Sequence, residues 1–111
     1  MTGAAWSRRW RVDELHPAFA GHFPGRPILP GVALLAEAIE AALDEPALAA
    51  ALGTSPRLVA AKFFVPVAPG TALVIDWRAT AKTLDWRIAD GEREVASGQF
   101  ARADLAPSGA P

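Results

Sequence analysis

Residues 30–44 of this chain read PGVALLAEAIEAALD, and this stretch decides the fold. Apolar residues recur in it every three or four positions, which is the spacing of an amphipathic helix. The Pro-Gly pair in front of it is typical of a helix start. We therefore predict one long helix from Val32 to about Asp44. Its apolar positions are Leu35, Ala38, Ile39, Ala42 and Leu43.

The sequence after this helix changes to the pattern of a β-sheet. Pro46 and Gly53 first bracket a short second helix, residues 47–52. Turn pairs at Pro69-Gly70 and Asp90-Gly91 then separate runs in which apolar and polar residues alternate. These runs predict antiparallel strands over residues 58–67, 72–81, 84–89 and 94–103.

A strand before the helix completes the predicted sheet, because Trp6 and Trp10 alternate with polar residues and share one face. One long helix with a run of antiparallel strands gives an α+β fold class, in which a curved sheet wraps around the helix. We predict a single domain over residues 1–105. Residues 106–111 hold only Ala, Pro, Ser and Gly, so we predict a disordered tail there.

The composition argues against several function classes. Of the 111 residues, 51% are hydrophobic and 21% are charged, which predicts a packed core. The formal net charge is −1, so we expect no general attraction to nucleic acid or to membranes. With no cysteine and two histidines, we expect no metal site. No apolar run approaches about 20 residues, and we expect a cytoplasmic protein.

His22 is the best candidate for a catalytic group, and it lies in a segment between residues 15 and 31 that is dense in Pro and Gly. Imidazole is the side chain that gains and loses a proton near neutral pH. The apolar neighbours Phe19 and Phe23 would exclude water and favour the neutral base. The alternative is a histidine that only makes a structural hydrogen bond, which is our interpretation of His16.

Gly31 supplies a second element of a site because it opens the predicted helix. The first amides of a helix lack intrahelical partners and lie at the positive end of its dipole, so they can stabilise an oxyanion. Glycine also removes the Cβ that would block a thioester from these amides. Every helix has such an end, so this signal is weak by itself.

The segment around His22 and Gly31 resembles the signature loop of the 3-hydroxyacyl-[acyl carrier protein] dehydratases of fatty acid synthesis. The matching residues are His16-Pro17, Phe19 and Gly21-His22-Phe23-Pro24-Gly25-Arg26-Pro27-Ile28-Leu29-Pro30-Gly31-Val32. The later residues that resemble the sheet of the same family are Lys62-Phe63, Pro66-Val67, Pro69-Gly70-Thr71, Leu73 and Gly98. The resemblance therefore covers about residues 6–102.

The resemblance implies a hot-dog fold and a dimer in which His22 of one subunit faces a carboxylate on the central helix of the other. Amides near Gly31 and Val32 would polarise the thioester carbonyl of a 3-hydroxyacyl chain on acyl carrier protein. The histidine would remove the α proton and the acid would protonate the leaving hydroxyl, which gives a trans-2-enoyl thioester for fatty acid, lipid or polyene synthesis. The resemblance implies no metal or redox cofactor. The expected pocket residues are Phe23, Pro30 and Phe63.

The sequence departs from that family at the helix acid. The acid comes fourteen positions after the histidine, and here that position is Ala36. Glu37 follows directly, and Glu40 lies about one helical turn beyond Ala36. We predict that Glu37, or alternatively Glu40, serves as the acid through a shift of the helix. The other interpretation is that both are solvated charges on the helix face.

Other functions also fit the sequence. One is a catalytically impaired hot-dog subunit that binds acyl thioesters, in a heterodimer whose partner donates the acid. Another is a hot-dog thioesterase that activates water with a helix carboxylate, although the His-Phe-Pro-Gly sequence argues against it. A non-enzymatic carrier-binding scaffold is the third. The cations that could contact an acidic carrier protein, or only protect a sheet edge, are Arg8, Arg9, Arg11, Arg26 and Lys62.

Overall fold

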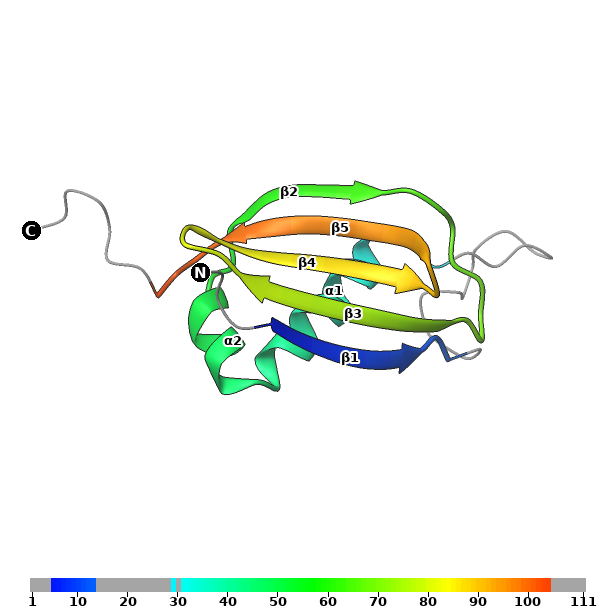
Figure 1. Cartoon of the computed structure of the whole chain (residues 1–111), viewed down its shortest axis with the longest axis horizontal. Coiled ribbons are helices and arrows are strands. Elements are labelled where there is room, and N and C mark those ends of the chain that lie inside the picture. The colour runs from blue at the N-terminus through cyan, green and yellow to red at the C-terminus, as the bar shows by residue number, and fades with distance from the viewer. Residues whose placement is uncertain (1–4, 14–28, 30, 105–111) are drawn as a thin grey trace, which may run out of the picture.

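A computed structural model describes residues 5–13, 29 and 31–104 of the chain. The elements follow in the order β1 (Ala5–Arg11), α1 (Gly31–Leu43), α2 (Pro46–Leu52), β2 (Leu58–Phe63), β3 (Ala72–Ala79), β4 (Thr83–Asp90) and β5 (Arg93–Ala101). The five strands form one antiparallel sheet in the order β1-β3-β4-β5-β2, and both helices lie on the same face of it (Figure 1). This is the α+β hot-dog arrangement, so the predicted fold class is confirmed.

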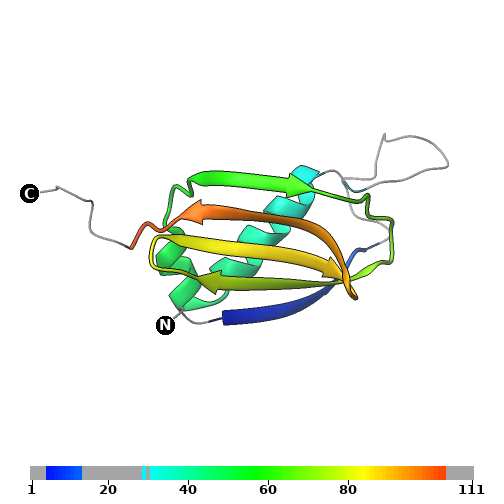
Figure 2. The same cartoon turned by 45° about the horizontal axis from the view of Figure 1, so that its top comes forward.

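The long helix α1 forms within one residue of its predicted bounds. It crosses behind the sheet diagonally, from the β2 side at its N-terminal end to the β1 side at its C-terminal end (Figure 2). Its buried positions have the three-and-four spacing of an amphipathic helix. They are Leu34, Ala38, Ala41 and Ala42. The short helix α2 is confirmed as well, with Pro46 in its first turn and Gly53 after it at a φ of 78°.

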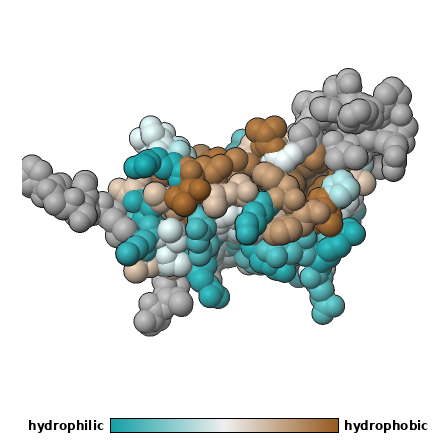
Figure 3. All heavy atoms as spheres, turned by 90° about the horizontal axis from the view of Figure 1, so that it is seen from above, coloured by the Kyte–Doolittle hydropathy of each residue, from teal (hydrophilic) through white to brown (hydrophobic). Residues whose placement is uncertain are grey.

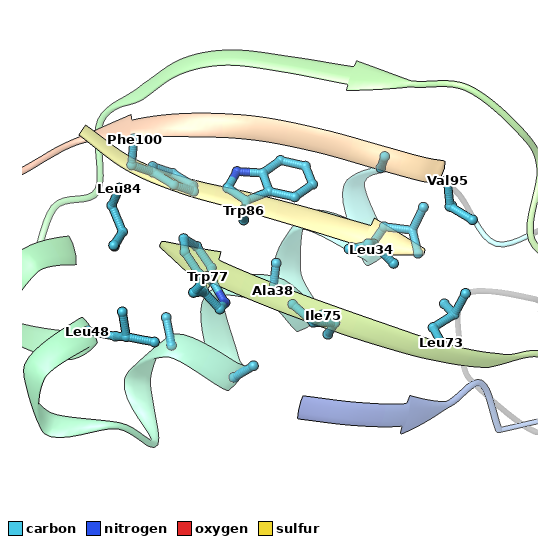
Figure 4. Packing of buried hydrophobic residues seen from close by; sticks show 14 of the residues in the cluster. Leu34, Ala38, Leu48, Leu73, Ile75, Trp77, Leu84, Trp86, Val95 and Phe100 are labelled. Atoms are coloured by element: carbon cyan, nitrogen blue, oxygen red, sulfur yellow. The ribbon is translucent and has the colours of Figure 1, made fainter. Parts of the chain in front are cut away.

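Aromatic side chains fill the space between α1 and the sheet. Trp77 of β3 pairs with Trp86 of β4 across the sheet, and both are 2% exposed (Figure 4). The ring of Phe100 stacks on Trp77 at a centroid distance of 6.2 Å. These three residues therefore form the centre of the core, as large aromatic side chains usually do. The predicted inner face of β3 is confirmed in full, because Leu73, Ile75, Trp77 and Ala79 are all buried.

Gly98 of β5 lets the Trp86 indole lie directly on the sheet. A Cβ at Gly98 would come within 2.5 Å of the Cζ2 atom of Trp86 and within 2.5 Å of the Ala60 carbonyl oxygen. Real side chains do not approach backbone this closely, so packing alone requires glycine at this position.

Three strands end earlier than predicted. The strand expected over 94–103 ends at Ala101, and the next residues, Arg102 and Ala103, bond to other elements. We expected the strand at 58–67 to reach Val67, but β2 ends at Phe63. Pro66 has no N–H to donate to a neighbouring strand. The Val67 carbonyl accepts a hydrogen bond from Leu29 N at 2.8 Å, and Leu29 is not part of a strand. The strand expected over 72–81 ends at Ala79, because Thr80 N donates to the Thr83 carbonyl at 2.8 Å and starts a turn.

The predicted tail, residues 106–111, lies outside the described residues. Within the described ranges, neither helix is long and apolar enough to cross a membrane.

The end of β5 is tied to two other elements. Arg102 donates from Nη1 to the Thr80 carbonyl at 2.7 Å, which joins it to the β3–β4 turn. Ala103 N donates to the Ala51 carbonyl at 2.7 Å, which joins it to α2. Arg102 also donates to both carboxylate oxygens of Asp104, at 2.9 and 2.8 Å. This paired geometry is the strong form of an Arg–carboxylate interaction.

Asp104 is expected to make stability depend on pH. Its hydrogen bonds from Arg102 hold its pKa below the ordinary value of 3.8. A lowered folded-state pKa means that the pair stabilises the fold above the unfolded-state pKa, and that this contribution is lost as pH falls through the folded-state pKa. The two side chains are 21% and 32% exposed, so we expect less than about 1 kcal/mol. Asp104→Asn should lower the free energy of unfolding at neutral pH and leave it unchanged in strong acid.

Urea unfolding of wild type and of Asp104→Asn at neutral and acid pH measures the difference in their free energies of unfolding. Glu92→Gln, on the exposed β4–β5 turn, is the matched control and should change the free energy of unfolding at neither pH. A difference between wild type and Asp104→Asn that stays constant from neutral pH into acid would show that the carboxylate charge is not its source.

Candidate functional site

An open cavity lies at the N-terminal end of α1, where we expected the thioester to bind. Its volume is about 350 Å³. The residues that line it are Leu29, Gly31, Leu34, Phe63, Phe64, Val65 and Pro66. None of these seven residues has a charged or polar side chain. The backbone amides of the first helical turn lack intrahelical partners, so they lie beside an apolar space.

Gly31 and Phe63, two of the predicted site residues, are in contact. A Cβ at Gly31 would lie 3.1 Å from ring atoms Cδ1 and Cε1 of Phe63. Gly31 therefore lets the end of β2 approach α1. This packing role of the glycine is separate from its expected role in giving a thioester access to the helix amides. Val32, the other predicted oxyanion residue, is 73% exposed in the first turn of α1.

Phe63 is the last residue of β2 and Phe64 follows it, and neighbouring residues of an extended chain point to opposite sides. Phe63 pairs with Ala96 on the inner face of the sheet. Neither ring is buried, however, because Phe63 is 48% and Phe64 is 51% exposed. Both contribute to the cavity at α1. The end of β2 thus supplies aromatic surface to the cavity rather than to the core.

The residues on either side of the segment 14–28 are held by one connection. Val12 N donates to the Thr71 carbonyl at 2.9 Å, and Gly70 N donates to the Val12 carbonyl at 2.8 Å. Leu29, which is 3% exposed, donates to the Val67 carbonyl. The connection between β2 and β3 therefore holds both flanks of the segment that carries the predicted base. His22 itself lies outside the described residues, as do Phe23, Pro30, His16 and Arg26.

The three helix positions considered for the acid differ in exposure. Ala36 and Glu40 are exposed, whereas Glu37 is half-buried. At about 100° per residue, Glu40 lies roughly 40° from Ala36 around the helix, and Glu37 lies about 100° away, beside the buried face. Neither glutamate lines the cavity at Gly31. Along the helix axis, Glu37 is about 9 Å and Glu40 about 13 Å from Gly31.

The described cations do not gather into one patch. Arg8 and Arg9 point to opposite faces of β1, because neighbouring strand residues alternate. Arg8 pairs with Asp44 at 2.7 Å, and Arg11 donates to the Gly70 carbonyl at 2.7 Å. Lys62 lies on β2, at the opposite edge of the sheet. These positions favour the alternative interpretation, in which the charges protect two separate edges.

Edge strand β2 carries an exposed apolar surface that the sequence patterns above did not predict. Its large side chains Leu58, Val59 and Phe63, with Phe64 just beyond, are all about half exposed; we call these four residues the β2 surface. The view onto this edge shows hydrophobic side chains gathered along it (Figure 3). The signal in the sequence was Leu58-Val59-Ala60-Ala61, where apolar residues occupy consecutive positions instead of alternating.

Two larger open cavities, of about 410 and 430 Å³, lie along the sheet, and both are lined by Asp85 and Trp86. No residue of α1 lines either of them, so neither cavity has the helix amides that we expect to polarise the thioester carbonyl. Among the described residues, no three His, Cys, Asp or Glu side chains gather where they could hold a metal ion.

Comparison with known proteins shows which protein family the chain matches. A family model described as ApeI-like, ApeI dehydratase, matches residues 2–99. The 3-hydroxyacyl-[acyl-carrier-protein] dehydratase FabZ of Anaeromyxobacter sp. (strain K) is 37% identical over 80 residues, which cover 62% of this chain and 49% of that protein. The chain thus spans about half the length of the curated relative it matches.

Solved structures share the fold. The dehydratase heterocomplex ApeI:P from Xenorhabdus doucetiae has a TM-score of 0.70 and 20% identity, over 92% of this chain and 96% of that one. An uncharacterised protein from Erwinia carotovora subsp. atroseptica has a TM-score of 0.69 and 30% identity, over 89% and 82%. The fluoroacetyl-CoA-specific thioesterase FlK has a TM-score of 0.64 and 18% identity, over 93% of both chains. Because dehydratases and a thioesterase share it, the fold alone does not select the reaction.

The contact between Gly31 and Phe63 yields a test. In Gly31→Ala the new methyl group should push the Phe63 ring away by a few tenths of an ångström. The half-exposed ring can move, and alanine is favoured in helices, so the free energy of unfolding should change by less than about 1 kcal/mol. The NMR signals of the Phe63 ring, assigned with Phe63→Leu, should shift. Ala36→Ser on the exposed side of α1 is the control, and unchanged Phe63 signals in Gly31→Ala would contradict the contact.

Proposed function

Since this chain belongs to the ApeI-like dehydratase family, we propose that it eliminates water from a 3-hydroxyacyl thioester on acyl carrier protein and gives the trans-2-enoyl thioester. The observation that carries the proposal is the uncharged cavity at the N-terminal end of α1. An apolar space beside helix amides that lack intrahelical partners suits an acyl thioester, because its tail is apolar and its carbonyl accepts hydrogen bonds.

The proposed chemistry uses the amides near Gly31 and Val32 as donors to the thioester oxygen. They stabilise the negative charge that develops there when the α C–H bond breaks. His22 takes that proton on its neutral imidazole. The bond from C3 to the hydroxyl oxygen then breaks, the electron pair of the former C–H bond forms the new double bond, and an acid donates a proton so that water leaves.

Helix geometry supports a partner subunit as the source of the acid. The 3-hydroxyl group is a few bonds from the thioester carbonyl, whereas Glu37 and Glu40 of the same chain lie about 9 and 13 Å from Gly31 along the helix. A second subunit can bring its own helix to the cavity. Glu40 is exposed on the side of Ala36, which favours it over the half-buried Glu37 as the group that a partner's cavity meets.

The β2 surface supports a dimer. Among the described strands, β2 lies at an edge of the sheet, and such edges add strands readily. Its apolar side chains are about half exposed, so a second hot-dog chain that pairs with β2 would bury them. We propose that the site is completed across this pairing, by a second copy or by a related chain that carries the acid.

The second candidate is the impaired, acyl-binding subunit of a heterodimer. It is favoured by the exposed methyl group of Ala36 at the position where the resemblance implies an acid. In that case the chain supplies His22 and the cavity, and its partner supplies a glutamate or aspartate. The thioesterase alternative has no specific observation in its favour.

Turnover of a 3-hydroxyacyl carrier protein tests the proposal. His22→Asn should lower the rate of interconversion with the 2-enoyl form by about 10²–10⁴-fold, because it removes the base. Glu40→Gln should produce a similar loss and Glu37→Gln a smaller one. Absorbance of the enoyl thioester, checked by mass spectrometry, measures the rate. Glu45→Gln, an acid outside α1 that makes no capping hydrogen bond, is the control and should leave the rate unchanged.

The outcome also separates the two candidates. If wild-type protein binds the acyl carrier protein but converts nothing, and Ala36→Glu restores conversion, the impaired-subunit function is correct. Equal losses in Glu45→Gln and Glu40→Gln would rule out Glu40 as the acid.

Self-association tests the β2 surface. Val59→Asp should lower the dimer fraction strongly, because a carboxylate would be buried without a partner in the interface. Val59 is 58% exposed in the single chain, so the substitution should cost the monomer little stability. Ser7→Asp, the same charge change on the opposite edge strand β1, is the control. Sedimentation equilibrium measures the dimer fraction of wild type and of both variants. A dimer that Val59→Asp leaves intact would contradict pairing at β2, and a monomeric wild type would favour a heterodimer.

A further inference from the structure

The outer face of the sheet is the side that α1 and α2 leave uncovered (Figure 1). Buried and more exposed positions alternate along β3 and β4, so the residues between the buried ones point outward. On these two neighbouring strands, two acids and two arginines point outward within two rows. They are Asp76 and Arg78 on β3, and Asp85 and Arg87 on β4. We call these four residues the outer charge cluster.

Opposite charges alternate in the outer charge cluster, both along and across the strands. Strand pairing puts Asp76 opposite Arg87 and puts Arg78 opposite Asp85 in the next row. The cluster is therefore a checkerboard of two positive and two negative groups, and it carries no net charge.

The members of the outer charge cluster do not form ion pairs with one another within the chain. Arg87 lies 3.5 Å from Glu94, and Asp85 accepts a hydrogen bond from the Thr83 hydroxyl at 2.7 Å. The other two members have no side-chain hydrogen bond or ion pair within the described part of the chain. They are Asp76 and Arg78. These charges are therefore available to a second molecule.

One of the two open cavities along the sheet lies inside the outer charge cluster. Its volume is about 430 Å³. All four members of the cluster line it, and they are its charged lining residues. The long side chains of a facing molecule can therefore enter the hollow and reach groups of opposite charge.

The charge pattern indicates which kind of surface fits the cluster. A surface with charges of one sign, such as nucleic acid or an acidic protein, is attracted by half of the cluster and repelled by the other half. A complementary surface must carry the same alternation. The cluster is such a surface for itself, because turning a copy over about a two-fold axis in the plane of the sheet places each arginine over an aspartate.

We propose that a second copy of this chain packs face to face on the outer charge cluster, about a two-fold axis that passes through the hollow. With the axis parallel to the strands, Arg78 of one copy faces Asp85 of the other, and with the axis across the strands it faces Asp76 of the other. Each contact then occurs twice. Packed sheets lie about 10 Å apart, a gap that arginine and aspartate side chains fill from opposite sides.

Salt dependence is the first test, and the Val59→Asp protein is used so that pairing at the β2 surface is blocked. Exposed ion pairs contribute little each, so we expect a dissociation constant on the order of 10⁻⁴ M at 0.1 M NaCl. At 1 M NaCl the Debye length falls from about 10 to about 3 Å, and the association constant should fall at least about tenfold. Sedimentation equilibrium at both salt concentrations measures the association constant.

Charge reversal is the second test. In the same Val59→Asp protein, Arg78→Asp should lower the association constant at 0.1 M NaCl at least about tenfold, because two aspartates then face each other. Lys82→Asp makes the same charge change at an exposed position of the β3–β4 turn. It lies outside the cluster and should leave the association constant unchanged. Circular dichroism confirms that each variant is folded.

A second substitution should restore association and identify the axis. Arg78→Asp with Asp85→Arg restores every opposed pair if the axis is parallel to the strands, whereas Arg78→Asp with Asp76→Arg does so if the axis runs across them. The first of these double variants also keeps opposite charges across the strands within one chain, so it should fold as well as the parent protein.

The outcomes decide for or against the face-to-face dimer. Val59→Asp protein that is monomeric up to about 1 mM at 0.1 M NaCl would overturn the proposal, since the expected dissociation constant lies below that concentration. So would association that neither 1 M NaCl nor Arg78→Asp weakens, because another surface would then be its source. Restoration by one double variant supports the dimer, and restoration by neither refutes the two-fold arrangement. No member of the cluster lines the cavity at α1, so these results do not depend on the proposed dehydratase activity.

Discussion

The packing of α1 on the aromatic inner face of the sheet is the interaction on which the rest of the structure depends. Ala38 and Ala42 are fully buried, and their short side chains leave room for the indoles of Trp77 and Trp86 between helix and strands. On the sheet side, Gly98 leaves the corresponding room beneath Trp86. Because protein interiors are close-packed, small residues on both layers and large rings between them must occur together.

This packing also determines where chemistry can occur. The helix crosses the sheet diagonally, so its N-terminal end emerges beside the end of β2 (Figure 2). Gly31 allows Phe63 to close against it. The first amides of α1 thus lie in an apolar cavity, where the lower dielectric strengthens their attraction for a developing charge. The same helix carries its glutamates one and a half to two and a half turns further on, away from this end.

Local patterns predicted the elements well and their ends less well. The spacing of Ala38 and Ala42 was sufficient for α1, and alternation was sufficient for the buried face of β3. The end of β2 was missed because the Val67 carbonyl bonds to Leu29, a residue far away in the sequence. The turn at Thr80 contains neither glycine nor proline and is held by threonine hydroxyls, so the usual turn signals were absent.

The sequence by itself determined the helix, the alternating strands, the α+β class and the resemblance of the segment around His22, because these are encoded in residues that are neighbours along the chain. Only the tertiary structure decided that Gly31 contacts Phe63, that the cations of β1 and β2 lie on opposite edges, and that β2 keeps its apolar side chains exposed. Those features depend on how elements more than thirty residues apart pack, and periodicity carries no information about the direction from which a distant element arrives.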